Sequence, residues 1–352
     1  MEVSRFMIKH KKSIVNIMIG LSISMTILFS GCSKKETGPI SKTEILLDTP
    51  CTITIYDKVS DDVLAKGFDK LKEIDTRMNA NTENSEIALI NKNAGSAYAK
   101  VSDETFYVIE EGKKYGDITK GKFDITVGPL VKLWGINTDH ARVPSESEIK
   151  EKLKLISYND VLLKESTKEV MLKNANMSLD LGGIAKGYAG DAVAKVLKEN
   201  GVKHALIDLG GNIMTVGNKV DGSNWRIGVQ NPNSERGESL GVVEVADKAV
   251  VTSGIYERFF TQDGKKYHHI LDTETGYPVD NNLASVSIIA DKSVDGDAYA
   301  KAFTLGLEKG IEFIESQSGV QAIFVTKDSK VYITSGLKDN FKITDENFKL
   351  MN

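Results

Sequence analysis

The residues between Ser178 and Asp191 have types and a spacing that could hold an anion. Four glycines surround Asp180 and Lys186 in this segment, which follows a strand-like run and precedes a run with helical apolar spacing. Glycine lets a phosphate approach backbone N–H groups, a helix N-terminus favours negative charge, and a lysine adds a mobile cation. The spacing is neither GxGxxG nor a P-loop. The segment therefore indicates either a site for a phosphate-bearing ligand or a structural turn with a surface lysine.

Three other stretches of the sequence carry side chains that could belong to such a site. Asp124 lies in an apolar segment bounded by glycines, where it either caps a turn or contacts a ligand, because an unpaired buried carboxylate is costly. His268 and His269 are neighbours in a strand-like run, so at most one of them points into a site, and a strand histidine can also be purely structural. Asp297 stands near the start of a predicted helix, where N-capping is the alternative to ligand binding.

Both strands and helices are expected to position these residues. Alternation of apolar and polar residues predicts strands, apolar residues on one face predict helices, and Ser145 with Glu148 has the spacing of a capping box. The predicted strands cover 45–56, 225–230 and 239–251, and the predicted helices cover 63–78, 106–115 and 145–157.

Length and charge limit the class of protein. The 352 residues are enough to bury a large core, in one large domain or in two subdomains. Without residues 1–31, 41 Lys and Arg face 48 Asp and Glu, and this acidic balance argues against a nucleic-acid partner. The sequence has two cysteines, Cys32 and Cys51. If Cys32 carries a lipid, as its surroundings suggest (next paragraph), Cys51 has no partner, so no disulfide forms within the chain and the stability of the fold comes from its core.

The N-terminus has the pattern of an export signal. Four basic residues precede an uncharged run from Ser13 to Ser30, and Gly31-Cys32 follows directly. A small residue before a cysteine is typical of a bacterial lipoprotein cleavage site, and an uncleaved membrane anchor is the alternative. The sequence predicts a signal peptide over 1–31, lipid on Cys32, a flexible tether over 32–42 and a folded domain over 43–352.

Five ordered motifs together resemble the ApbE family of FAD:protein FMN transferases. The resemblance runs from about Leu47 to Gly306, and its specificity lies in the order of all five motifs. They are Met78–Glu86, Gly121–Pro129, Asp180–Gly187 (Asp-Leu-Gly-Gly-x-Ala-Lys-Gly), His269–Pro278 (His-x-x-Asp-x-x-Thr-Gly-x-Pro) and Asp297–Lys301.

The resemblance implies an α+β fold of mixed sheets with flanking helices. It also implies bound FAD, a magnesium ion at the pyrophosphate, and transfer of FMN through a phosphoester to a Thr or Ser hydroxyl of an extracytoplasmic acceptor, with release of AMP. The implied acceptors are subunits of membrane redox pumps or secreted flavin-bearing reductases. With the lipid on Cys32, the expected location is the cell membrane, on its extracytoplasmic side.

The resemblance also assigns the residues of the site. His269 takes the catalytic position, and the carbonyl of Gly183 and the carboxylate of Asp297 hold the metal, with Lys301 at the position of the family's third ligand, a threonine. The implied FAD contacts are Asn81, Lys122, Phe123, Asp124, Asp180, Lys186 and Leu271.

Two departures from the family pattern bear on activity. Asn81 replaces the family's loop tyrosine and removes a stacking face for the flavin. Lys301 replaces the threonine, and an ammonium cannot ligate a cation, although it can contact phosphate. The metal could instead be held by Asp297, Gly183 and water. The alternatives to a transferase are a lipid-anchored FAD-binding protein without catalysis and an FAD pyrophosphatase giving FMN and AMP.

Overall fold

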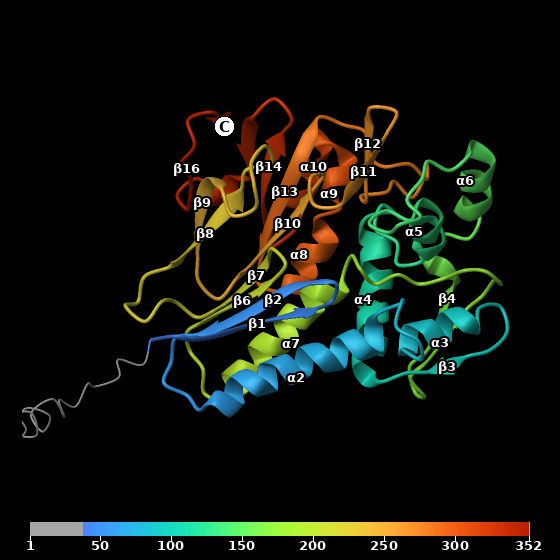
Figure 1. Cartoon of the computed structure of the whole chain (residues 1–352), viewed down its shortest axis with the longest axis horizontal. Helices are drawn as coiled ribbons and strands as arrows, with labels where there is room; N and C mark the ends of the chain where they lie inside the picture. Colours follow the sequence, from blue (N-terminus) through green and yellow to red (C-terminus); the bar gives the residue numbers. More distant parts are fainter. Residues whose placement is uncertain (1–37, 352) are drawn as a thin grey trace, which may run out of the picture. The chain divides into compact units, whose positions relative to one another are not determined.

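A nine-stranded sheet forms the centre of the protein, whose computed structural model describes residues 38–351 (Figure 1). The strand order is β1-β2-β6-β7-β10-β13-β14-β15-β17, and every neighbouring pair is antiparallel except β15 and β17. The strands are β1 (Ile40–Leu46), β2 (Thr49–Ile55), β6 (Ala205–Leu209), β7 (Asn212–Val216), β10 (Ala249–Gly254), β13 (Leu283–Ala290), β14 (Gln321–Thr326), β15 (Lys330–Ile333) and β17 (Lys349–Leu350).

The central strands separate two hydrophobic cores. Every residue of β13 is buried, so this strand is covered on both faces. Ile288 belongs to the larger core, whereas its neighbour Ile289 belongs to a second core that contains Trp225 and Val243. Successive side chains of a strand point to opposite faces, and the alternation therefore assigns one face of the sheet to each core.

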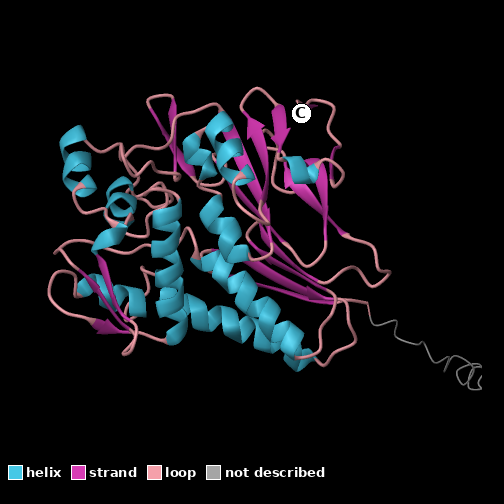
Figure 2. Cartoon of the chain, turned by 180° about the vertical axis from the view of Figure 1, so that it is seen from behind, coloured by secondary structure: helices cyan, strands magenta, loops and turns pink. Residues whose placement is uncertain are grey.

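Helices cover the face of the larger core (Figure 2). The helices α2 (Asp61–Met78), α7 (Ala185–Glu199) and α8 (Ser293–Tyr299) pack in succession, with α7 against β7 and α8 against β10. The other helices are α3 (Glu86–Lys92), α4 (Asp103–Ile118), α5 (Gly128–Trp134), α6 (Glu146–Leu153), α9 (Ala302–Leu305) and α10 (Leu307–Glu315), with 3-10 turns η1 (Tyr158–Asp160) and η2 (Ser335–Leu337).

Three small sheets complete the fold. One, in the order β16 (Phe341–Ile343), β9 (Ser239–Val245), β8 (Trp225–Gln230), supplies the second core. Another joins β3 (Ala99–Lys100), β5 (Glu169–Leu172) and β4 (Val161–Lys164). The third is the hairpin of β11 (Phe259–Gln262) and β12 (Lys265–His268), which packs through Phe260 and Tyr267 on a small core around Trp134.

The predicted α+β class, with mixed sheets and flanking helices, is confirmed, but the predicted strand over 45–56 is wrong. Its first residues belong to β1, because the chain turns at Leu47 and Asp48, which have φ values of 53° and 57°. Glycine, asparagine and aspartate are the usual residues at such positive φ values, and the leucine at the first of these two positions hides the turn. The predicted strand over 239–251 is likewise divided, into β9 and β10.

The helix predictions are largely confirmed. The helix predicted over 106–115 starts earlier, at Asp103, because the Ser102 side chain accepts from the Thr105 N–H. The capping box is formed: the Ser145 hydroxyl accepts from the backbone N–H of Glu148, and the Glu148 carboxylate accepts from the Ser145 N–H. That helix ends at Leu153, before the predicted end at 157.

Two glycines of the segment 178–191 lie inside a helix, where the sequence predicts a turn. α7 starts at Ala185 and includes Gly187 and Gly190. A Cβ atom on Gly187 would stand 2.4 Å from the carbonyl oxygen of Ser293, and one on Gly190 would stand 3.2 Å from the Ser293 hydroxyl. These glycines therefore serve the close approach of α7 to α8, a long-range contact that the local sequence does not encode.

The predicted signal peptide, Cys32 and the first part of the tether lie outside the described residues. A compact unit begins at Pro39 and contains the rest of the described chain. Within residues 38–351, no helix has the length and apolar content needed to cross a membrane.

Candidate active site

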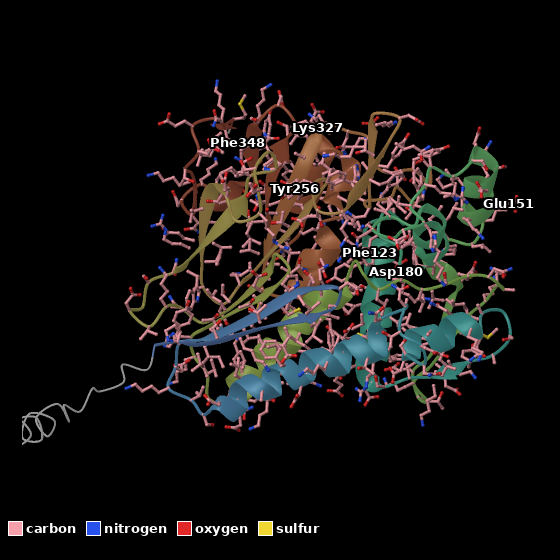
Figure 3. The ribbon with its side chains drawn as sticks, viewed as in Figure 1. Phe123, Glu151, Asp180, Tyr256, Lys327 and Phe348 are labelled. Carbon is pink, nitrogen blue, oxygen red and sulfur yellow. The ribbon has the colours of Figure 1, made fainter. Side chains whose placement is uncertain are left out.

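A cavity of about 420 Å³ collects the residues predicted to form the site. The predicted residues that line it are Lys122, Phe123, Asp124, Asp180, Gly183, Lys186, His269, Leu271, Asp297 and Lys301. Asn81 does not line it; it is an exposed residue in the loop after α2. Phe123 and Asp180 are labelled near the middle of the molecule in Figure 3. Segments far apart in the sequence thus meet at one place.

Asp124 both caps the backbone and faces the cavity. One oxygen of its carboxylate accepts from the Thr126 N–H at 2.7 Å and from the Thr126 hydroxyl at 2.6 Å, and the other accepts from the Tyr158 N–H at 2.9 Å. Burial raises the pKa of this carboxyl, although the three hydrogen bonds oppose the shift. Asp124 therefore has the capping role that the sequence left open. Its hydrogen bonds hold in place the part of the cavity wall that includes Phe123.

The glycine turn before α7 is held from two sides. The Asp180 carboxylate accepts from the Gly182 N–H at 2.8 Å, and the Asp180 N–H donates to the Ile125 carbonyl at 2.8 Å. Gly183 lies beside an aromatic ring, because a Cβ added there would stand 3.3 Å from Phe123. The first two glycines of the segment thus shape a turn, as predicted, on the cavity wall.

Asp297 joins α8 to the beginning of α7. Its carboxylate is buried and accepts from the Gly187 N–H at 2.6 Å and from the Asn212 side-chain amide at 2.6 Å. It lies in the middle of α8, so it does not cap its own helix and instead binds a free N–H in the first turn of another. The helix N-terminus expected to face a phosphate is in part occupied by this carboxylate.

Two lysines bring positive charge to the same wall. Lys186 lies in the first turn of α7, and Lys301 lies between α8 and α9. Burial lowers the pKa of the Lys301 ammonium, while the charges of Asp297 and Asp180 raise it. Within residues 38–351, neither ammonium forms a hydrogen bond or an ion pair. Both charges are therefore available to an anion in the cavity.

Lys122 differs from these two because it is already paired. Its ammonium lies 2.8 Å from the Glu274 carboxylate and 3.5 Å from that of Asp272. Burial lowers its pKa, but the two acidic partners outweigh that effect and raise it. The Thr273 hydroxyl donates to the Gly121 carbonyl at 2.7 Å, so the segment that contains Leu271 is attached to the Asp124 segment at several points.

The two adjacent histidines have different surroundings. His268 is buried, and its Nε2 lies 2.9 Å from the Val279 carbonyl oxygen. His269 lines the cavity, and its Nδ1 lies 3.2 Å from the Arg258 carbonyl oxygen. A carbonyl only accepts, so Nδ1 of His269 carries the proton and Nε2 is left with a lone pair. Burial and then the charge of Lys301 lower the pKa of His269 to about 3, so the free protein holds it neutral.

Some cavity residues were not assigned from the sequence. Asn212, Arg236 and Arg258 also line the cavity, and they come from three separate segments. Asn212 follows directly on a second Asp-Leu-Gly-Gly run, residues 208–211, which was the one signal available for it. The two arginines do not stand in any of the sequence motifs. Arg258 immediately precedes β11, and its guanidinium donates to the Asp48 carbonyl at 3.5 Å.

The three-ligand magnesium site implied by the resemblance does not fit the residues present. Gly183 offers a carbonyl oxygen, and both carboxylate oxygens of Asp297 already accept hydrogen bonds. The third position is an ammonium, which has no lone pair. Among the described residues, no group of three or more His, Cys, Asp or Glu is placed to hold a metal ion.

Comparisons with known proteins agree with the resemblance. The ApbE family model matches residues 47–324. An FAD:protein FMN transferase of Klebsiella pneumoniae (strain 342) is 36% identical over 313 residues, which cover 88% of this chain and 96% of that protein. An FAD:protein FMN transferase of Treponema pallidum (strain Nichols) is 34% identical over 359 aligned positions, which cover 97% of this chain and 99% of that protein.

Solved structures show the same fold. The ApbE protein of Thermotoga maritima superposes with a TM-score of 0.80 at 30% identity, covering 85% of this chain and 98% of that one. The flavin transferase ApbE of Vibrio cholerae superposes with a TM-score of 0.77 at 27% identity. The superposition covers 86% of this chain and 99% of that one.

Proposed function

The chain belongs to the ApbE family, and we propose that it is a flavin transferase that moves the FMN part of FAD to a Thr or Ser hydroxyl of an acceptor protein, releasing AMP. One observation carries the proposal: one cavity contains the unprotonated Nε2 of His269 and the ammonium groups of Lys186 and Lys301, which have no partner among residues 38–351. A base and a site for a polyanion are the two parts that phosphoryl transfer to a hydroxyl requires.

The proposed reaction is an in-line displacement at phosphorus. The acceptor hydroxyl oxygen attacks the phosphorus on the FMN side of the FAD pyrophosphate, and the hydroxyl proton goes to Nε2 of His269. The bond between that phosphorus and the bridging oxygen breaks, and AMP leaves with the bridging oxygen. The product is a phosphoester between FMN and the acceptor side chain, so no oxidant or further reactant is needed.

The surrounding residues assist by orienting and by neutralising charge. The carbonyl of Arg258 holds the His269 ring in the tautomer that accepts a proton. The negative pyrophosphate raises the pKa of this imidazole from its low value in the free protein, which makes it a stronger base once FAD is bound. Lys186 and Lys301 bring positive charge to the cavity, which Arg236 and Arg258 also line.

The expected dependence on magnesium is not part of this mechanism. Of the three positions that the resemblance assigns to the metal, two, Gly183 and Asp297, would offer oxygen ligands, and water would have to complete the shell. Every step above uses groups of the chain, of FAD and of the acceptor.

We also propose that the enzyme acts outside the cytoplasm, held to the membrane by lipid on Cys32. The support is the basic, then uncharged segment that ends at Gly31-Cys32. The acceptor is then an extracytoplasmic flavoprotein, such as a subunit of a membrane redox pump or a secreted reductase.

The proposal is tested by the balance of products. With FAD alone and then with FAD and a threonine-bearing acceptor, AMP and free FMN are measured by chromatography. A transferase releases AMP only in step with FMN bound to protein. Equal amounts of free FMN and AMP without an acceptor would indicate a pyrophosphatase, and no AMP in either case would indicate a binding protein.

A further inference from the structure

Resting on the proposed function, we infer that the Lys301 ammonium itself neutralises the FAD pyrophosphate at the position of the missing third metal ligand, so that this protein binds FAD without magnesium. The inference comes from the disagreement between the residues present and the implied metal site. It concerns the ligand-binding step and is independent of whether FMN is later transferred.

The first observation is the position of the lysine. Lys301 follows Asp297 by four residues, and its Cε lies 3.8 Å from the point that a Cβ on Gly183 would occupy. The charged end of the side chain therefore lies beside the glycine whose carbonyl would be a metal ligand. A doubly charged cation placed among these groups would be repelled by the ammonium.

The second observation is that nothing in the described chain pairs with this charge. Lys301 is partly buried, and its ammonium has no hydrogen-bond or ion-pair partner in residues 38–351. The carboxylate of Asp297 is held instead by Gly187 and Asn212. A buried charge without a partner is costly, and an anionic ligand in the cavity would remove that cost.

The third observation is the charge balance around the position. Asp297 and Asp180 are the acidic groups that act on Lys301, and Lys186 adds a second positive charge. Lys122, by contrast, is already matched by Asp272 and Glu274. The two ammonium groups, unpaired within the described part of the chain, offer the two positive charges that a pyrophosphate diester requires, which is the charge that one magnesium ion would supply. Arg236 and Arg258 line the same cavity and add to this positive charge.

The test measures FAD binding by flavin fluorescence and calorimetry on the wild-type protein, with EDTA and with Mg²⁺. The variant Lys301→Thr replaces the ammonium by the hydroxyl that the family has at this position. Lys301→Met has neither a positive charge nor a metal ligand, and Lys301→Arg keeps the positive charge. Lys195→Thr is the matched control, because Lys195 is on the exposed side of α7 and its side chain is 76% exposed. Thermal unfolding of each variant shows that it is folded.

Wild type and Lys195→Thr should bind FAD about equally well with EDTA and with Mg²⁺. Lys301→Arg keeps the charge, so the ratio of its affinities in EDTA and in Mg²⁺ should equal that of wild type, whatever its absolute affinity. Lys301→Thr should lose about tenfold or more in affinity in EDTA and recover it with Mg²⁺, and Lys301→Met should be weak in both, since a charge-assisted contact is missing. If wild type loses FAD in EDTA, or if Lys301→Thr behaves as wild type does, the inference is overturned. If the protein binds FAD without metal but transfers no FMN, the result would support this inference and would contradict only the proposed function.

Discussion

The carboxylate of Asp297 accepts a hydrogen bond from the backbone N–H of Gly187 at 2.6 Å, which ties the middle of α8 to the first turn of α7. The same carboxylate holds the side chain of Asn212, so one buried group joins two helices and a strand at the wall of the active-site cavity. The geometry of that wall depends on this residue even before FAD binds.

Removal of the Asp297 carboxylate should therefore destabilise the fold. Asp297→Ala leaves two buried donors without partners, and we expect the free energy of unfolding to fall by about 2–6 kcal/mol, since each such group costs about 1–3 kcal/mol. Asp297→Asn keeps one acceptor and should cost less. Urea unfolding measures both values. Equal stability of Asp297→Ala and wild type would show that these hydrogen bonds do not hold α7 and α8 together.

His268→Ala should damage stability and spare transfer. The His268 ring is buried, bonds the Val279 carbonyl and lies edge-on to Phe303, so its loss should lower the free energy of unfolding by about 1–3 kcal/mol. Transfer per folded molecule should be little changed, because the ring does not line the cavity. A transfer rate that falls as far as that of His269→Ala would contradict this division between the two histidines.

The imidazole of His269 should stay neutral in the free protein over the whole range from pH 5 to 8. Its pKa is lowered to about 3, first by burial and then by Lys301. Below about pH 6.5 the unfolded chain takes up a proton at this position that the folded chain does not, so His269 costs stability as the pH falls. NMR titration of labelled histidine measures the pKa, and Lys301→Met should raise it. A titration midpoint near 6.5 in the free protein would contradict the described environment.

Much of this site was predictable because its residues lie in ordered motifs. Asp124, Asp180, Lys186, His269 and Asp297 each stand in a short pattern, and the cavity brings all five together. The sequence failed where position depends on contacts between distant segments. Gly187 lies inside a helix because α8 passes close to it, and no local pattern distinguishes that from a turn.

The same reason explains the other errors. The turn at Leu47 and Asp48 contains no glycine, and leucine rarely takes a positive φ, so the sequence pattern predicts one strand where β1 and β2 are separate. Arg258 reaches the cavity because its neighbours pair in a hairpin, and the pairing of two strands is a property of the fold. Asn81 was placed in the site by position in a motif, whereas the loop that carries it lies outside the cavity.

Cys32 should determine the processing of the precursor. Cys32→Ser removes the thiol that would carry the lipid, so the protein should accumulate as an unlipidated, full-length precursor. Metabolic labelling with a fatty acid and the mass of the chain in membrane fractions measure this. Normal cleavage of the Cys32→Ser chain would indicate an ordinary signal peptide.

The central claim is tested most directly by the intact mass of an acceptor protein after incubation with FAD and this enzyme. With wild type, the acceptor should gain one FMN less one water, and the modified residue should be a Thr or Ser. His269→Ala should still bind FAD but modify the acceptor at least about a hundredfold more slowly, because a positioned base contributes about 10²–10⁴ in rate. An acceptor of unchanged mass with wild type, or equal rates for wild type and His269→Ala, would contradict the account.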